Sequence, residues 1–591
     1  MHTFHIPVMG IGFSIDTPVK VAHLGVSSVI SLIDDMLLER MRTMFCQKLG
    51  MPYQEIHART PDARALRITA YLNLINQMVQ QKFNELKDAV RNASPGFEKY
   101  FALLPDDSPL KRFYTSISET IASKPDQIKK LLNLMQPGSI DVNIMTKLDR
   151  PNQRKGETLP VAFNDAHAAL RGFAQSDLNA SVVLSAGLNP RLYSYFEQFE
   201  DFYPNANGLC KKRIVLKVSD FRSASIQSKL FAKKGLWISE FRVESGLNCG
   251  GHAFPTQGLL MGPILDAFRQ NKSTLIEQNY SLYVQTLKAQ NRNVPEQPPT
   301  THISFQGGVG THLEHRFLLN HYQLNSVGWG SPFMLVPEVI NIDKQTLQML
   351  CDATGEELFL SDISPLGIPF NSLRNNTKDI EKQLWIDQGT PGSTCPKKYG
   401  AIMAEGFCTA SRSFQRNSIR ALDQLNLEKS DYDDAHQKIT NKACICVGLG
   451  TTALIVNDII RKSDGHAVSV CPGPNLAFFH REATFEQMVH HIYGKTDLLD
   501  GVNRPNVFVN ELNLYFNYLL AAVKGIAQIP TRSDADYLDS FRNNLLEGIR
   551  YYEELALNES ILFDQQNLNL LTQIKQQLET LQVETVAENQ A

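Results

Sequence analysis

The sequence lacks the features that mark membrane proteins and nucleic-acid-binding proteins. It contains no uninterrupted apolar run of about 18 residues or more, so no segment is expected to span a bilayer. Lysine and arginine number 58 against 61 aspartates and glutamates, which gives a net charge of −3. Because there is no basic excess, we expect neither nucleic acid nor an anionic membrane surface as a partner.

Signals for secretion and for a disulfide framework are also missing. The first residues, Met1 to Phe13, contain no basic segment followed by a long apolar one, so a secretory signal is not expected. The nine cysteines are odd in number and follow no framework spacing. These two absences favour reduced thiols, metal ligands or catalytic cysteines over disulfides, and they predict a cytoplasmic protein.

The composition is that of an ordinary globular protein with several structural units. Apolar residues make up 43% and charged residues 20% of 591 positions. A chain of this length exceeds one compact core and predicts about two to four units.

Eight short apolar segments, mostly separated by helical stretches, predict the architecture. They lie at residues 4–12, 24–33, 139–146, 180–186, 213–219, 236–244, 302–306 and 325–335. Alternation of strand and helix is typical of a parallel α/β sheet, and eight units favour closure into a (β/α)8 TIM barrel. An open, doubly wound sheet is the alternative, because periodicity does not establish closure.

Two long stretches fall outside this alternation. Residues 35–137 show a helical pattern, and because structureless loops of that length are rare in compact domains, we predict an inserted helical subdomain. A less regular segment follows the last predicted strand, and the chain is again helical from residue 484. The predicted units are the barrel start 1–34, the insertion 35–137, the rest of the barrel 138–375, a cysteine-containing extension 376–480 and a mainly helical C-terminal region 481–591. We expect any homo-oligomer to form through the helical regions.

Two glycine clusters follow the seventh and eighth predicted strands. Their residues are Gly307, Gly308 and Gly310 in the first cluster and Gly328, Gly330 and Ser331 in the second. Glycines allow close approach of the backbone to a ligand, and the loops after strands 7 and 8 of such barrels are the usual phosphate site. The pair of clusters therefore favours phosphate binding over simple turns.

The segment after the sixth predicted strand carries a candidate acid or base. It reads Glu244-Ser-Gly-Leu-Asn-Cys-Gly-Gly-His252, and catalytic groups of barrels lie at the carboxyl ends of strands. The imidazole of His252 titrates near neutral pH, which suits proton transfer, although a lone loop histidine is commonly only polar surface. Lys217, at the end of the fifth strand, is either a partner of an anionic ligand or a salt-bridged barrel lysine.

Several of these motifs, in order along the chain, resemble the nitronate monooxygenase (2-nitropropane dioxygenase) family and the related FMN-dependent enoyl-ACP reductases. The motifs are Pro7-Val8-Met9-Gly10 with Ser14-Ile15-Asp16-Thr17-Pro18, Val142-Asn143-Ile144, Cys249-Gly250-Gly251-His252, Gly307-Gly308-Val309, Gly330-Ser331-Pro332-Phe333, Ser364-Pro365-Leu366-Gly367-Ile368-Pro369 and Gly473-Pro474-Asn475-Leu476. The resemblance covers roughly residues 1–34 and 138–480. The family's Gln-Gly-x-Glu motif is not cleanly present, and Glu240, Arg242 or Glu244 could occupy its place.

The resemblance implies an FMN-dependent oxidoreductase acting on a small organic substrate. His252 would be the catalytic acid or base, with Lys217 beside the flavin or a substrate anion. The cofactor-binding residues that it implies, together with those of the glycine loops, are Met9, Gly10, Gly12, Asn143, Lys217, Gly250, Gly251, Gly307, Gly308, Gly310, Gly328, Gly330 and Ser331. The alternative function is a non-redox protein on the same barrel, either a binder of a phosphorylated metabolite or an assembly subunit.

Five of the nine cysteines gather in the extension. They are Cys395, Cys408, Cys444, Cys446 and Cys471. Four thiolates suit an iron–sulfur cluster or a structural zinc ion, but the spacing matches no standard signature and buried free thiols are the competing interpretation. Local density suggests that the first four share one metal or cluster, with Cys471 as a substitute ligand.

Overall fold

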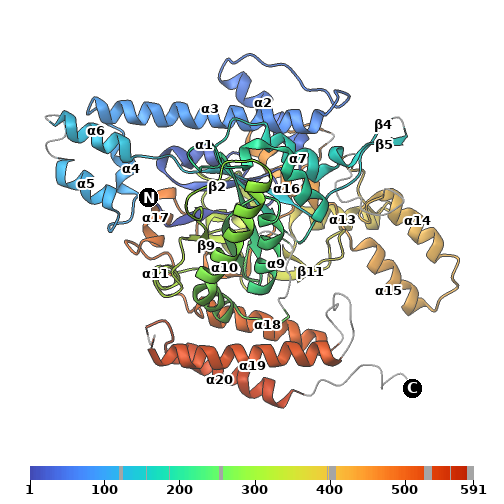
Figure 1. Cartoon of the computed structure of the whole chain (residues 1–591). Helices are drawn as coiled ribbons and strands as arrows, with labels where there is room; N and C mark the ends of the chain where they lie inside the picture. The colour runs from blue at the N-terminus through green and yellow to red at the C-terminus, as the bar shows by residue number, and fades with distance from the viewer. Residues whose placement is uncertain are drawn as a thin grey trace.

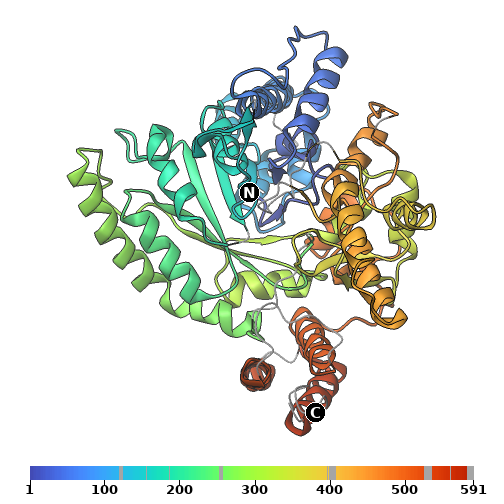
Figure 2. The ribbon, with the colours of Figure 1, turned by 90° about the vertical axis from the view of Figure 1, so that its right-hand side faces the viewer.

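The computed structural model contains a closed barrel of eight parallel strands (Figures 1 and 2). It describes residues 1–118, 124–154, 156–185, 187–249, 251, 257–395, 397, 407–462, 464–524, 535–558 and 561–581. The barrel strands are β1 (Phe4–Ile6), β2 (Ser27–Ser31), β3 (Ile140–Met145), β6 (Ala180–Ser185), β7 (Lys212–Val218), β8 (Ile238–Glu244), β9 (His302–Gln306) and β10 (Ser326–Gly328). Their order around the barrel is β1-β10-β9-β8-β7-β6-β3-β2. This confirms the (β/α)8 architecture and excludes the open sheet.

The first and last strands are shorter than the apolar segments that predict them. β1 ends at Ile6 because Pro7 has no N–H to continue the ladder, and Gly10 then turns with a φ of +54°. β10 ends at Gly328, and the residues after it form a short 3-10 helix, Ser331–Leu335. The apolar residues that follow both strands are buried outside the sheet. Their hydrophobicity therefore reflects burial, and it does not indicate that they pair as strands.

Alternate residues of each strand face the barrel interior. On β8, Phe241 packs against Phe268 of the surrounding helix α10 (Met261–Ala289), with ring centroids 5.8 Å apart. The alternation of side chains therefore turns Glu240, Arg242 and Glu244 inward. Val29, Val183 and Val215 from three other strands form a small separate apolar cluster, against which Val8 packs.

Helices surround the barrel, and further helices extend beyond it to the left, to the right and below in Figure 1. Besides α10, those up to the end of the barrel are α1 (Thr17–Val21), α2 (Asp35–Lys48), α3 (Ala63–Arg91), α4 (Glu98–Ala102), α5 (Pro109–Ile117), α6 (Pro125–Leu134), α7 (Asp165–Ala174), α8 (Pro190–Tyr195), α9 (Phe221–Ala232) and α11 (His312–His321). The later helices are α12 (Lys344–Asp352), α13 (Thr377–Asp387), α14 (Arg412–Leu422), α15 (Lys429–Thr440), α16 (Ile445–Val456), α17 (Phe485–Ile492), α18 (Val507–Val523), α19 (Ala535–Asn558) and α20 (Gln565–Thr580). Two antiparallel hairpins also form, β4 (Gln153–Arg154) with β5 (Glu157–Thr158), and β11 (Leu358–Ser361) with β12 (Phe370–Leu373).

The long helix α3 occupies the place of the barrel helix after the second strand. It packs against α1 and α7, which follow the first and third barrel strands. The approach to α7 is close: a Cβ on Gly172 would lie 2.8 Å from the carbonyl oxygen of Ala65, and the Thr69 hydroxyl donates to the Gly172 carbonyl at 2.9 Å. Within the stretch 35–137, α4, α5 and α6 lie beside the C-terminal part of α3 (Figure 1), where the rings of Phe83 and Tyr100 are 6.5 Å apart.

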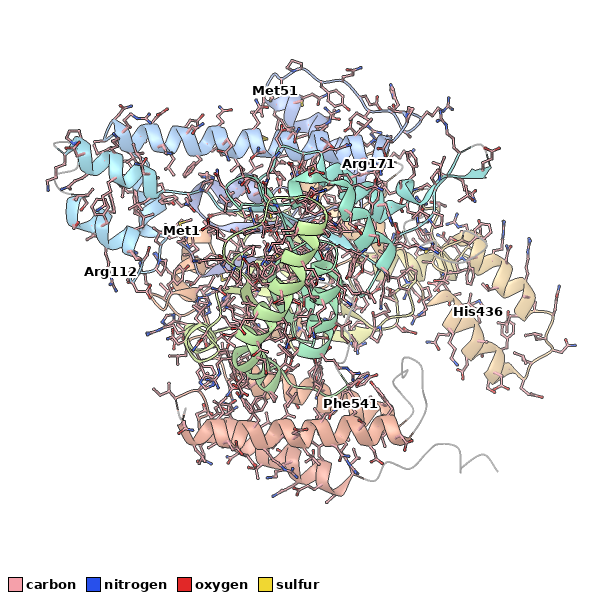
Figure 3. All side chains as sticks on the ribbon, viewed as in Figure 1. Met1, Met51, Arg112, Arg171, His436 and Phe541 are labelled. Carbon is pink, nitrogen blue, oxygen red and sulfur yellow. The ribbon has the colours of Figure 1, made fainter. Side chains whose placement is uncertain are left out.

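The last three helices form a separate layer below the barrel in Figure 1. α18, α19 and α20 pack on one another, and α18 and α19 pack on α10. Phe541 of α19, labelled in Figure 3, is fully buried among Tyr515, Tyr518 and Tyr537. In the described part of the chain, no single helix is long and apolar enough to cross a bilayer. Taken together, α15 and α16 have the length and apolar composition of a span, but the two helices are bent by 45° relative to each other.

Candidate active site

A cavity of about 320 Å³ opens at the carboxyl-terminal mouth of the barrel. Residues at or just beyond the ends of six neighbouring strands line it: Val8, Gly10, Ser31, Asn143, Ser185, Lys217 and Glu244. Apolar side chains of Ile11, Ile33, Phe370 and Leu449 form much of the remaining wall. A mostly apolar cavity with a few converging polar groups, at this end of a barrel, is the expected place of an active site.

The charged residues that line the cavity include Lys147 and an ion pair between adjacent strands. Lys217 of β7 lies 2.5 Å from a carboxylate oxygen of Glu244 at the end of β8. That oxygen also accepts a hydrogen bond from the Gln306 amide at 2.8 Å and one from Asn248. Lys217 is therefore salt-bridged at the cavity wall, and its contact with an anionic ligand stays a prediction.

Asn143 presents a buried acceptor without a partner. Its side chain is 5% exposed, and among the described residues nothing donates a hydrogen bond to its Oδ1 atom. An orphaned polar atom costs free energy on burial unless a ligand or water satisfies it. Because Asn143 lines the cavity, a ligand with an N–H or O–H group suits it. The ring of a flavin carries such a group, so the mouth fits that part of FMN.

Below the mouth, Glu240 and Arg242 form a buried ion pair inside the barrel. The Arg242 Nε donates to Glu240 at 2.8 Å, and the hydroxyl of Ser304 also donates to this carboxylate. Burial opposes the charge of Glu240, but the guanidinium outweighs it and lowers the pKa of the carboxyl to about 2. Glu240 and Arg242 are thus paired with each other inside the barrel. Of the three inward-facing charged residues of β8, Glu244 is the one that lines the cavity.

The two glycine loops lie beside the cavity wall but do not line it. Leu247, in the loop after β8, covers the first: a Cβ on Gly308 would lie 2.4 Å from its Cδ1. Cys249 covers the second, since a Cβ on Gly330 would lie 3.0 Å from the Cβ of Cys249. The Ser331 hydroxyl accepts a hydrogen bond from the Gly473 N–H at 3.0 Å. A phosphate on these loops therefore requires the segment Leu247–Cys249 to move, and their role stays a prediction.

The other predicted site residues divide into three groups. Gly10, Asn143 and Lys217 line the cavity. Met9 and Gly12 are buried beneath it, where the Met9 N–H donates to Ser14 and the Gly12 N–H donates to the Leu449 carbonyl of α16. Gly251 contacts the cavity-lining Phe370, while Gly250 and His252 lie outside the described residues.

Cys249 is a packed thiol. Its sulfur lies 3.6 Å from the Met334 sulfur and 3.5 Å from the carbonyl oxygen of Cys471. Burial raises the pKa of Cys249 to about 12, so the reactive thiolate is suppressed at neutral pH. The geometry favours a packing role for this residue.

Segments after the barrel complete the cavity, and the sequence interpretation missed them. Helix α16 contributes Ile445, Cys446 and Leu449, and the β11–β12 hairpin contributes Pro365 and Leu366 from its loop and Phe370 and Asn371 from β12. The available signals were the Ser364-to-Pro369 motif, which forms the hairpin loop, and the glycines of α16. Gly12 allows the first barrel loop to pass close to α16, because a Cβ on Gly12 would lie 2.9 Å from the Gly450 carbonyl oxygen.

The cysteines of the extension separate into two places. Cys395, Cys408, Cys444 and Cys446 line one cavity of about 280 Å³, whereas Cys471 is buried beside Cys249. Within the described residues, no group of three or more histidine, cysteine or acidic side chains is arranged to hold a metal ion. The structure therefore supports neither the iron–sulfur nor the zinc interpretation, and the position of Cys471 separates it from the other four cysteines.

The C-terminal helices support the cavity loop through a buried carboxyl. Glu511 of α18 accepts hydrogen bonds from the Ser245 hydroxyl at 2.6 Å and from the Met261 N–H at 2.7 Å. Burial raises the pKa of Glu511 from 4.5 to about 7. The contribution of this carboxyl to stability is therefore fully present below about pH 4.5 and is lost as the pH rises through about 7.

We expect Glu511→Gln to flatten the pH dependence of stability. The amide stays neutral, so the variant should match the wild type near pH 4.5 and exceed it above pH 7, on the order of 1 kcal/mol. Thermal melts from pH 4.5 to 8 measure the difference. Parallel curves for the two proteins would contradict a raised pKa, and Glu547→Gln in α19, for which no such bonds are described, is the control.

The fold and the mouth geometry define a (β/α)8 barrel protein with a candidate active site at the usual end. No protein-family model matches the chain, and no curated protein matches it. Among solved structures, the chain is similar to the enoyl reductase domain of MlnA from the macrolactin biosynthesis cluster of Bacillus amyloliquefaciens, with 13% identity, a TM-score of 0.35 and coverage of 67% of this chain and 88% of that one. It is also similar to FabK from Thermotoga maritima, with 11% identity, a TM-score of 0.30 and coverage of 66% and 83%. Values this low carry no argument about function.

Proposed function

We propose that this protein is an FMN-dependent oxidoreductase that acts on a small organic substrate in the barrel-mouth cavity. The observation that carries the proposal is the buried, unpartnered acceptor of Asn143 in a largely apolar cavity that also holds the Lys217–Glu244 pair. Bound FMN would supply the hydride or electron chemistry, which belongs to the cofactor. The motif resemblance to nitronate monooxygenases and FMN-dependent enoyl-ACP reductases supports the same reaction class.

The residues of this chain have separate tasks in the proposal. Asn143, Gly10 and Lys217 would hold the flavin ring, and the two glycine loops would hold its phosphate once Leu247 and Cys249 move aside. The apolar wall excludes water from the ring, which strengthens the electrostatic interactions of Lys217. His252 would give a proton to the substrate or remove one from it.

Flavin content tests the proposal directly. We expect the purified full-length protein to be yellow and to release about one FMN per chain, as one barrel mouth binds one flavin. Turnover is then assayed with a nitronate and with an α,β-unsaturated thioester plus a reduced nicotinamide. A protein that contains no flavin and does not bind added FMN overturns the proposal.

A non-redox binder of a phosphorylated metabolite is the second candidate. It would hold the metabolite's phosphate on the same glycine loops, so it too requires Leu247 and Cys249 to move aside. The same flavin measurement separates the two, since the second candidate predicts a colourless protein that is stabilised by a sugar phosphate.

We expect Asn143→Leu to have opposite effects on the free and flavin-bound protein. Leucine removes the orphaned acceptor, so the flavin-free protein should gain about 1 kcal/mol of stability, while flavin affinity should fall about tenfold through the lost hydrogen bond. Thermal melts of flavin-free protein and fluorescence titration with FMN measure these effects. Asn341→Leu, at a buried asparagine bonded to Asp16, is the control and should lower stability. Unchanged FMN affinity in Asn143→Leu would remove this residue from the site.

A further inference from the structure

Two cysteines of the extension form a hydrogen-bonded pair in the wall of a cavity beside the barrel mouth. Cys395 follows α13, and Cys444 is the residue before α16. Both line the cavity of about 280 Å³, and the Cys444 side chain is hydrogen-bonded to that of Cys395. Cys408 and Cys446 line the same cavity, but their described interactions with Cys395 are electrostatic. Cys444 is therefore the cysteine best placed to react with Cys395.

The two members of this pair differ in exposure and in charge. Cys395 is partly exposed, so a small solute can reach it, whereas Cys444 is buried. The hydrogen bond with Cys395, together with burial, raises the pKa of the Cys444 thiol well above its ordinary value. Cys444 therefore keeps its proton and donates it to the Cys395 sulfur. A sulfur that accepts such a bond is favoured as the thiolate, which is the form that attacks an oxidant.

Basic side chains add positive charge near Cys395. The Lys397 ammonium forms a salt bridge with Asp34 at the start of α2. Burial opposes this charge, but the Asp34 carboxylate and the Cys395 sulfur outweigh it and raise the pKa of Lys397. Arg412 and Arg416 also line the cavity. Because nearby cations stabilise a thiolate, these surroundings favour Cys395 as the nucleophile of the pair.

We propose that Cys395 and Cys444 form a peroxide-sensitive dithiol that closes to a reversible disulfide. The Cys395 thiolate attacks one oxygen of hydrogen peroxide, the O–O bond breaks, and a sulfenic acid forms while the other oxygen leaves as hydroxide and becomes water. The Cys444 sulfur then attacks the sulfenic sulfur, the S–O bond breaks, and the Cys444 proton leaves with that oxygen as a second water. The two sulfurs lose two electrons, and the peroxide gains them.

The disulfide acts on the wall of the barrel mouth. Cys444 directly precedes α16, whose Ile445, Cys446 and Leu449 line the mouth cavity. A bond to Cys395 ties the start of this helix to the chain that precedes the α14–α15 hairpin. Oxidation thus restrains one side of the mouth, whatever ligand the mouth binds, so the proposal does not rest on the proposed function.

Thiol counting and peptide mapping of the full-length protein test the pair. Reduced protein is treated with hydrogen peroxide, its remaining thiols are counted, and its cross-linked peptides are mapped by mass spectrometry, with fragmentation to separate Cys444 from Cys446. We expect a loss of about two thiols per chain, a cross-link between Cys395 and Cys444, and full recovery of the thiols with dithiothreitol. Retention of all thiols, or a cross-link that omits either residue, overturns the proposal.

Substitutions separate the roles of the two cysteines. Cys444→Ser should stop at the sulfenic acid on Cys395, which a 1,3-dione reagent labels, while Cys395→Ser should give neither the label nor the disulfide. Cys408→Ser, at another cysteine of the same cavity, is the matched control and should still form the cross-link. Circular dichroism shows whether each variant is folded, and mapping of the wild-type protein decides the proposal if one is not. Equal thiol loss in the wild type and in folded Cys395→Ser overturns it.

Discussion

Replacing Arg504 with methionine should lower the free energy of unfolding by about 3–5 kcal/mol, because it leaves a buried carboxylate unpaired. The Arg504 guanidinium lies 2.6 Å from the Glu314 carboxylate, and the two side chains are 3% and 1% exposed. Methionine has similar length and removes the charge, so the loss reports the missing ion pair more than a cavity.

The pair matters because it joins the barrel to the segments after it. Arg504 also donates to the Gly308 carbonyl at 2.5 Å and to the Asn475 side chain at 2.8 Å. Glu314 caps the amino terminus of α11 through the Gly310 and Thr311 N–H groups, and it accepts from the Val507 N–H at the start of α18. One substitution therefore loosens a barrel loop, a barrel helix and the C-terminal layer together.

Denaturant unfolding followed by tryptophan fluorescence measures this loss. Trp329 is buried 5.8 Å from the His491 ring, and His491 bonds the Gly310 carbonyl, so its emission reports on this region. Arg91→Met is the control, since Arg91 and Asp88 form an exposed pair worth about 0–1 kcal/mol. A loss below 1 kcal/mol in Arg504→Met would contradict a central role for the pair.

His252→Ala should keep the flavin and reduce turnover by about 10²–10⁴-fold, the usual contribution of a positioned acid or base. The prediction rests on the motif resemblance and on the described residues before His252. Asn248 lines the cavity, and Gly251 lies against the cavity-lining Phe370, its carbonyl accepting from the Asn371 N–H at 2.7 Å. The segment after β8 thus reaches the mouth.

Steady-state rates and flavin content of the same preparations measure this effect. His436→Ala, in the α14–α15 hairpin that projects away from the barrel (Figure 3), is the control and should leave both unchanged. An unchanged rate in His252→Ala, on a substrate that the wild type turns over, would reject the acid–base role. Loss of flavin without a specific loss of rate per bound flavin would assign His252 to cofactor binding.

The barrel could be predicted from the sequence because its determinants are local. Parallel barrel strands are buried on both faces, so each appears as a short apolar run such as the fully buried β6 between helical stretches. Eight such runs predicted eight strands, and the inward position of Lys217 follows from strand alternation. Strand ends were less predictable, because buried loops such as Ser331–Leu335 are as apolar as strands.

Other contacts depend on residues far apart in sequence, so only the tertiary structure decided them. No local pattern indicates that α16 and the β11–β12 hairpin complete the cavity, or that Leu247 and Cys249 cover the glycine loops. The pairing of Arg504 with Glu314 and the separation of Cys471 from the other four cysteines likewise arise from long-range packing. Sequence determined the barrel and the order of its motifs, because burial and chain direction are encoded locally. Only the tertiary structure decided which side chains contact one another, because close packing brings together segments that are far apart in sequence, and their spacing along the chain does not predict the contact.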